Sequence, residues 1–113
     1  MTIPFDHHVF VCTNRRTDGH PRGSCAARGS EALRDALKAA VKEAGISGVR
    51  INGSGCLDFC EHGPVVVDHP RNVWWKGVSV GDVARIVAGP LANGTALSDL
   101  EMSEADLRRG TRV

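Results

Sequence analysis

Four cysteines are the residues of this chain best suited to chemistry. Cys56 and Cys60 lie mid-chain with three residues between them, whereas Cys12 and Cys25 lie nearer the N-terminus with twelve residues between them. In one turn of helix, side chains four residues apart share a face, so Cys56 and Cys60 could bind one iron. A loop that folds back could bring Cys12 and Cys25 to the second iron of an all-cysteine [2Fe-2S] cluster.

Other metal sites with familiar cysteine spacings fit the sequence less well. Plant-type ferredoxins have a C-x4-C-x2-C run, radical enzymes of the C-x3-C-x2-C type would need a cysteine at Gly63, and zinc ribbons favour two C-x2-C knuckles. None of these spacings occurs. A zinc site stays open at this point, because Zn²⁺ also accepts four thiolates.

Size and composition predict a single cytoplasmic domain. At 113 residues the chain can bury a core without disulfides, and a net charge of +1 favours neither nucleic acid nor an anionic membrane as partner. The sequence contains neither an apolar run long enough for a membrane helix nor a signal peptide. In a reducing cytosol, cysteines are more often metal ligands or redox groups than disulfides.

A β-α-β unit is predicted to position the first cysteines. Apolar and β-branched residues over 3 to 12 predict a strand that ends at Cys12, and the Gly-rich and Pro-containing residues 13 to 29 predict a loop carrying Cys25. A helix should follow, with Ser30 as N-cap and Gly45 as terminator. Its buried stripe should contain Leu33, Ala36, Leu37, Ala40, Val41 and Ala44.

A second strand over residues 49 to 52 completes this unit, and residues 53 to 55 turn into Cys56. A right-handed crossover makes the two strands parallel, with their carboxyl ends at one edge of the sheet. Cys12 and Cys56 should therefore lie near each other. Peptide N–H groups of residues 13 to 16 and 53 to 55 are the expected hydrogen-bond donors to the sulfurs.

The second half of the chain predicts a hairpin and a helix. Strands over residues 64 to 68 and 73 to 76 should pair antiparallel, and a helix capped by Ser79 should end at Gly89-Pro90. Its buried face should contain Val80, Val83, Ile86 and Val87.

Beyond residue 90 the sequence predicts a C-terminal tail, residues 91 to 113, that is only partly ordered. Leu97, Leu100 and Leu107 are its anchors, and a short helix is expected over residues 103 to 109. The domain itself should span residues 1 to 90. The order βαβ then ββα is that of an α/β, thioredoxin-like core around a mixed sheet of four or five strands.

The chain resembles the thioredoxin-like [2Fe-2S] ferredoxins, which are related to the small thioredoxin-like subunit of NADH dehydrogenase. The resemblance covers about residues 6 to 90 and rests on three runs of sequence: His8-Val9-Phe10-Val11-Cys12-Thr13-Asn14, Gly23-Ser24-Cys25, and Gly55-Cys56-Leu57-Asp58-Phe59-Cys60-Glu61-His62-Gly63-Pro64. It implies that Cys12, Cys25, Cys56 and Cys60 ligate the cluster. It also implies one-electron transfer between redox proteins and a homodimer. No enzymatic activity of its own is expected, because the sequence contains neither a nucleophile and base pair nor a phosphate loop.

Several other residues allow more than one interpretation. Arg15 and Arg16 belong to a basic loop that could dock an acidic redox partner or merely offset cluster charge. The adjacent Trp74 and Trp75 should face opposite sides of the sheet, one in the core and the other under a helix or in an interface. Pro64 follows the last cysteine, at a place where thioredoxin folds often have a cis proline, although base rates favour trans.

The five histidines are expected to be ordinary surface residues or neighbours of the ligands, and His62, two residues past Cys60, is the best candidate neighbour.

Two rival functions remain for the sequence. One is an interaction module stabilised by zinc, in which the metal holds the fold and the surface binds a partner. The other is a thiol-disulfide oxidoreductase, which needs an exposed, activated thiolate.

Overall fold

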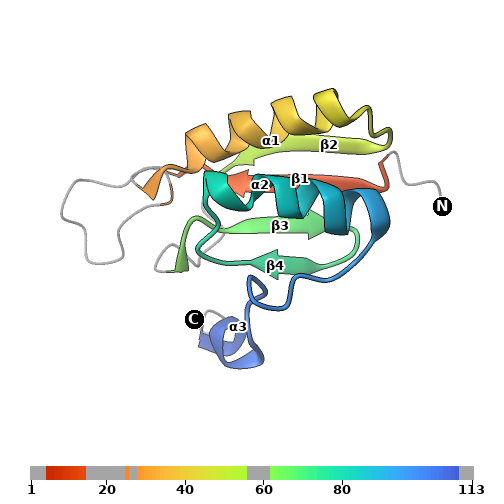
Figure 1. The fold of residues 1–113 in the computed structure, drawn as a ribbon. Helices are drawn as coiled ribbons and strands as arrows, with labels where there is room; N and C mark the ends of the chain where they lie inside the picture. The colour runs from red at the N-terminus through yellow and green to blue at the C-terminus, as the bar shows by residue number, and fades with distance from the viewer. Residues whose placement is uncertain (1–4, 15–24, 26–27, 56–61, 110–113) are drawn as a thin grey trace.

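The computed structural model describes residues 5–14, 25, 28–55 and 62–109. These residues form a four-stranded sheet of order β2-β1-β3-β4 (Figure 1). Strands β1 (His7–Cys12) and β2 (Val49–Ser54) are parallel, and β3 (Val66–His69) runs antiparallel to β1. The hairpin partner of β3 is β4 (Val73–Trp75). The mixed sheet and the predicted β-α-β and hairpin units are confirmed.

Helix α1 (Ser30–Ala44) covers the sheet with a buried stripe formed by Leu33, Leu37 and Val41. Ala44, predicted to be buried, is exposed. The prediction of Ser30 as N-cap was wrong, because Gly29 holds that position with a φ of 90° in the left-handed region. Ser30 is the first helical residue and is buried, so its hydroxyl points inward and cannot cap the helix.

The second helical segment is longer and less regular than predicted. A 3₁₀ turn (Val80–Asp82) leads into α2 (Val83–Ile86), which continues as a π-helical turn (Val87–Leu91) through Pro90. Proline has no N–H to donate, and the wider turn accommodates this loss. The helix therefore does not stop at Gly89-Pro90. Gly94, with a φ of 72°, donates its N–H to the Pro90 carbonyl at 3.1 Å and ends the segment.

The prediction that Ser79 caps this segment is confirmed, but the prediction that Val80 belongs to its buried face is wrong. The Ser79 N–H donates to Asp82 Oδ2 at 2.9 Å, which closes the first turn. Val83, Ile86 and Val87 are buried. Val80 is 54% exposed, because it starts the 3₁₀ turn rather than a full α-helical turn facing the sheet.

Helix α1 and the segment Val80–Leu91 lie on the same face of the sheet, called here the covered face (Figure 1). The other face, over which the described residues place no helix, is called the open face. On the covered face, Val9, Val11 and Trp75 pack with the helices. On the open face, Phe10, Val67 and Trp74 are partly buried and lie side by side across three strands. The prediction that the two tryptophans face opposite sides is confirmed.

Residues 97 to 102 pack against the sheet, so this part of the predicted loose tail is ordered. Leu100 is buried and joins the main core, and Leu97 packs against it. Glu101 forms an isolated antiparallel bridge with Trp75. Helix α3 (Glu104–Arg109) follows, close to the range predicted for it. The side chain of Leu107 lies outside the described residues.

Two further backbone features concern the segment after the cysteine motif and the hairpin turn. The Gly63-Pro64 bond is cis, so the trans isomer favoured by base rates was wrong at this position, and His69-Pro70 is cis as well.

Among the described residues, no helix is both long and apolar enough to cross a membrane.

His7 and Asp68 form a buried polar pair on the covered face of the sheet. Their side chains meet at 2.8 Å between Nδ1 and Oδ2, and Asp68 is only 1% exposed. Burial raises the pKa of Asp68 above 3.8, although its hydrogen bond with His7 opposes this shift. The native state therefore holds this proton more tightly than the unfolded chain does. The contribution of Asp68 to stability is greatest below 3.8 and falls as the pH rises through the folded pKa.

We expect the free energy of unfolding of Asp68→Asn to increase relative to that of the wild type as the pH rises through the folded pKa of Asp68. The amide avoids burying a charge and keeps an acceptor for His7. Urea unfolding of both proteins from about pH 4 to 7 measures this difference. Asp99→Asn is the control: a hydrogen bond from Arg85 lowers the pKa of the exposed Asp99, so its contribution is lost only as the pH falls below 3.8, and this variant should nearly parallel the wild type over the range measured. Parallel pH profiles for the wild type and Asp68→Asn would contradict the expectation.

Candidate functional site

Cys12 occupies the end of β1 and belongs to the open face of the sheet. Strand alternation directs Val9 and Val11 toward the helices and Cys12 away from them. Its side chain is nevertheless only 1% exposed, because residues from other segments cover it.

Hydrogen bonds on both sides of β1 fix the backbone at Cys12. The Cys12 N–H donates to the Val65 carbonyl at 3.0 Å. On the other side, the Thr13 N–H and Thr13 Oγ1 donate to the Ser54 carbonyl at 3.0 and 3.1 Å. The expectation that the Thr13 N–H serves a sulfur was therefore wrong, since this donor completes the parallel ladder with β2.

Cys25 is held against the start of α1. Its carbonyl accepts the Arg28 N–H at 3.0 Å and the Ser30 N–H at 3.1 Å, which makes a tight turn into the helix. The Cys25 side chain is fully buried at 0% exposure. The helix that packs on the sheet thus also fixes this cysteine.

Cys12 and Cys25 belong to one buried cluster. Val65 and Met102 complete its buried part, and Trp74 packs against it from β4. The structure therefore brings together two of the four predicted ligands, which lie thirteen positions apart in the sequence. Two sulfurs in one water-poor cluster suit a soft metal centre, because thiolates are the preferred protein ligands of iron–sulfur clusters and of zinc.

The other two predicted ligands, Cys56 and Cys60, lie outside the described residues. The chain on either side of them is described, and both flanks adjoin Cys12. Ser54 is the register partner of Cys12 in β2, and Val65 accepts its N–H. The segment between these flanks thus starts and ends beside the first cysteine, as the predicted topology requires.

The histidines differ in their surroundings. The expected surface position is wrong for His7, which is buried against Asp68. His8 stacks at a centroid distance of 4.2 Å on Phe10, and His69 is exposed. His62, the predicted neighbour of the ligands, lies 3.9 Å from Asp106 between Nε2 and Oδ1. Within the described ranges, no group of three or more His, Cys, Asp or Glu side chains could hold a metal ion. His20 lies outside these ranges, as do Arg15 and Arg16.

Sequence reasoning missed two residues of the C-terminal segment, Met102 and Asp106. Met102 is 8% exposed and belongs to the cysteine cluster. Asp106 accepts a hydrogen bond from Lys76 Nζ at 2.6 Å, which holds the pKa of its carboxyl well below the ordinary value. The available signal was the sequence Ser103-x-x-Asp106, a helix-capping pattern that follows an apolar residue.

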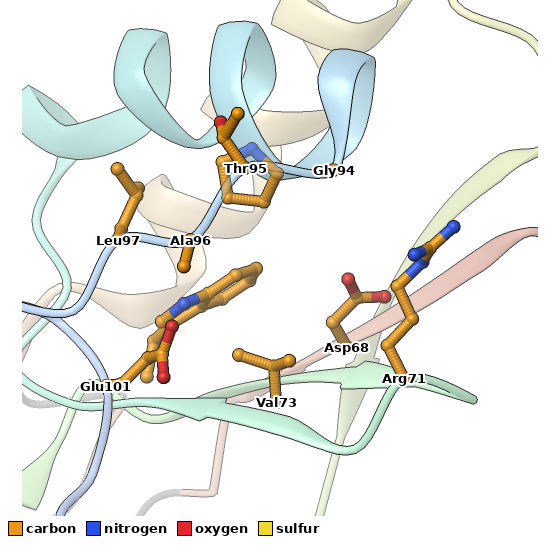
Figure 2. Close-up of a pocket in the computed structure, with 10 residues that line it drawn as sticks. Asp68, Arg71, Val73, Gly94, Thr95, Ala96, Leu97 and Glu101 are labelled. Atoms are coloured by element: carbon orange, nitrogen blue, oxygen red, sulfur yellow. The ribbon is translucent and has the colours of Figure 1, made fainter.

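A separate cavity of about 160 Å³ lies on the covered face of the sheet (Figure 2). Asp68 and Arg71 stand at one end and Glu101 at the other, and residues 94 to 97 pass over it. Two buried polar atoms of its lining residues, Asp68 Oδ1 and Trp75 Nε1, have no hydrogen-bond partner among the described residues. Neither Cys12 nor Cys25 lines it, so it is not part of the sulfur site.

Comparison with known proteins finds relatives that are all named 2Fe-2S ferredoxins, although no family model matches the sequence. The 2Fe-2S ferredoxin of Clostridium pasteurianum is 33% identical over 97 residues, which cover 85% of this chain and 95% of the relative. The 2Fe-2S ferredoxin of Aquifex aeolicus is 39% identical over 100 residues, covering 86% of this chain and 89% of the relative.

Solved structures agree with the sequence relatives. The structure of a thioredoxin-like [2Fe-2S] ferredoxin from Aquifex aeolicus superposes with a TM-score of 0.83 at 38% identity, covering 89% of this chain and 93% of that one. A cysteine-to-serine variant of that ferredoxin superposes with a TM-score of 0.82. Since relatives above 30% identity are spanned almost completely, the chain belongs to the thioredoxin-like [2Fe-2S] ferredoxin family.

Proposed function

We propose that this protein is a one-electron carrier between redox proteins, holds a [2Fe-2S] cluster and has no enzymatic activity of its own. The observation that carries the proposal is the burial of Cys12 and Cys25 in one cluster at the end of β1, in a chain of this family. A bound [2Fe-2S] cluster supplies reversible uptake of one electron. We further propose a cytoplasmic location, supported by the use of cysteine for metal rather than for disulfides.

Cys12, Cys25, Cys56 and Cys60 are the proposed ligands. Support for the first pair is their common burial, and support for the second is the position of the flanks of their segment beside Cys12. The surrounding chain holds the ligands through backbone hydrogen bonds at Cys12 and Cys25. Val65, Trp74 and Met102 keep water away from the sulfurs, and this apolar surrounding affects the potential of a bound centre.

We predict that replacing any one of the four cysteines with serine removes the cluster or makes it labile, because an alkoxide is a harder and poorer iron ligand than a thiolate. The measurement is the visible and EPR spectrum of anaerobically purified protein before and after dithionite, with iron and sulfide assays. Retention of the wild-type spectrum and iron content in any variant would remove that residue from the ligand set.

The same measurements on the wild type separate the rival functions. Stoichiometric zinc with no visible absorption would indicate an interaction module. Thiols that titrate in the native protein, together with disulfide exchange in the absence of iron, would indicate a thiol-disulfide oxidoreductase.

We also propose that the protein is a homodimer that packs through the open face of the sheet. No helix of the described chain covers this face, and Phe10, Val67 and Trp74 form a row across three adjacent strands. These side chains are only partly buried in a single chain. A row of aromatic and aliphatic side chains on a sheet gives the apolar centre that dimer interfaces need.

Val67→Glu should therefore shift the protein from dimer to monomer, because a charge at the centre of the interface loses its hydration when two copies meet. Analytical ultracentrifugation across a concentration series measures the change. The control is Val80→Glu, since Val80 is 54% exposed on the helical side, and this variant should remain dimeric. If Val67→Glu still sediments as a dimer, the open face is not the interface.

We propose in addition that redox partners dock near Arg15 and Arg16. The support is the excess of arginine over acidic residues in the sequence between Cys12 and Cys25. Positive charge beside a redox centre speeds encounter with an acidic partner and does so most strongly at low salt.

Reversing both residues, Arg15→Glu with Arg16→Glu, should lower the rate of electron transfer to a physiological partner by about tenfold at low ionic strength, and the effect should shrink at high salt. Stopped-flow mixing at several salt concentrations measures these rates. A salt-independent difference, or none at all, would argue against docking at this loop.

A further inference from the structure

The chain between Leu97 and Asp106 runs along β4 and crosses from the covered face of the sheet to the sulfur site. The Lys76 N–H donates to the Leu100 carbonyl at 2.8 Å, and the Met102 N–H donates to the Trp74 carbonyl at 2.9 Å. Leu100 packs in the main core, whereas Met102, two residues later, packs in the cysteine cluster. This segment therefore joins the two faces of the sheet.

Met102 is the member of this segment that lies against the cysteines. It is 8% exposed, and the two cysteines of the same cluster are 1% and 0% exposed. A thioether is flexible and apolar, so it fills an irregular space beside sulfur atoms without bringing water. Removing this side chain would leave an opening toward Cys12 and Cys25.

Asp106 fastens the segment in place. Its Oδ2 accepts hydrogen bonds from Lys76 Nζ at 2.6 Å and from the Ser103 N–H at 2.9 Å, and the Asp106 N–H donates to Ser103 Oγ at 3.1 Å. Its Oδ1 lies 3.9 Å from His62 Nε2. One carboxylate thus connects the residue after β4, the start of α3 and the chain that follows Cys60.

We propose that residues 100 to 106 form a cap over the sulfur site, in which Met102 excludes water from the cysteines and Asp106 fastens the cap to Lys76. The cap controls how readily water, oxygen and chelators reach a cluster held there, and so determines the lifetime of that cluster. This inference rests on the proposed cysteine site. It assigns a role to residues beyond the sequence pattern on which the family resemblance rests.

The first test asks whether the cluster is protected by the apolar character of the Met102 side chain or only by its volume. Met102→Leu keeps an apolar side chain of similar volume, whereas Met102→Gln keeps the shape and adds a polar amide. We expect Met102→Gln to lose visible cluster absorbance about tenfold faster than the wild type under a ferrous chelator in air, and Met102→Leu to resemble the wild type. All rates are measured well below the unfolding transition of each variant.

The second test concerns the ion pair between Asp106 and Lys76. Asp106→Asn removes the ion pair with Lys76 and should speed cluster loss in the same assay. The matched control is Asp99→Asn, which removes the ion pair between Asp99 and Arg85, made at 2.7 Å, from the same part of the chain. This control should leave the rate of cluster loss unchanged.

A readout that does not use the cluster is amide hydrogen exchange. Asp106→Asn should increase exchange at the Met102 and Lys76 amides, which pair the cap with β4, and leave the amides of α1 unaffected. Equal rates of cluster loss in Met102→Gln, Met102→Leu and the wild type would overturn the cap, as would equal acceleration by Asp106→Asn and Asp99→Asn. A wild-type protein without [2Fe-2S] absorbance would instead refute the proposed function.

Discussion

The position of Cys12 between two strands is the constraint on which the rest of the site depends. Its own N–H is bonded to Val65, and the next residue is bonded to Ser54, so the strand end cannot move relative to either neighbour. Both neighbours also flank the segment that carries Cys56 and Cys60. A parallel ladder on one side and an antiparallel ladder on the other therefore fix where the cysteine segment leaves and rejoins the sheet.

Helix α1 positions Cys25 at its N-terminal end. Its stripe of leucine and valine anchors it to the sheet, and its first turn begins with hydrogen bonds to the Cys25 carbonyl. Burial of that stripe removes apolar side chains from water and is the main stabilising contribution of the helix. The packing that stabilises the fold thus also places the second cysteine, and no separate structure is needed to hold it.

Regular patterns in the sequence were sufficient to predict the sheet, α1 and the opposite orientation of the two tryptophans. These features depend on periodicity over several residues, where one face is buried and the signal adds along the chain. Within the predicted helices, the errors concern single residues. Ser30 has the chemistry of a cap, but the left-handed turn at Gly29 moved the helix start by one residue. Pro90 has the chemistry of a terminator, but a π-helical turn accommodates it.

The C-terminal segment was hardest to predict, because its order comes from contacts that are distant in sequence. Met102 and Asp106 are bonded to Trp74 and Lys76, and nothing local in the sequence indicates that pairing. Of the candidate site, sequence patterns and family resemblance indicated the cysteines. They did not indicate which side chains surround them, since that depends on how the chain returns past β4.

In the buried pair, His7 sits at the opposite end of β1 from Cys12, whereas Asp68 pairs with Val9 in the middle of the strand. Three residue steps of extended strand separate Val9 from Cys12, a distance of about 10 Å. Two charges about 10 Å apart interact by about 1.7 kcal/mol at an effective dielectric constant of about 20, so a proton gained or lost at Asp68 affects charge held by the sulfurs. The acid–base equilibrium of the interior and the electron occupancy of the metal centre are therefore coupled through the sheet, and acidity that changes the robustness of the fold also bears on its redox behaviour.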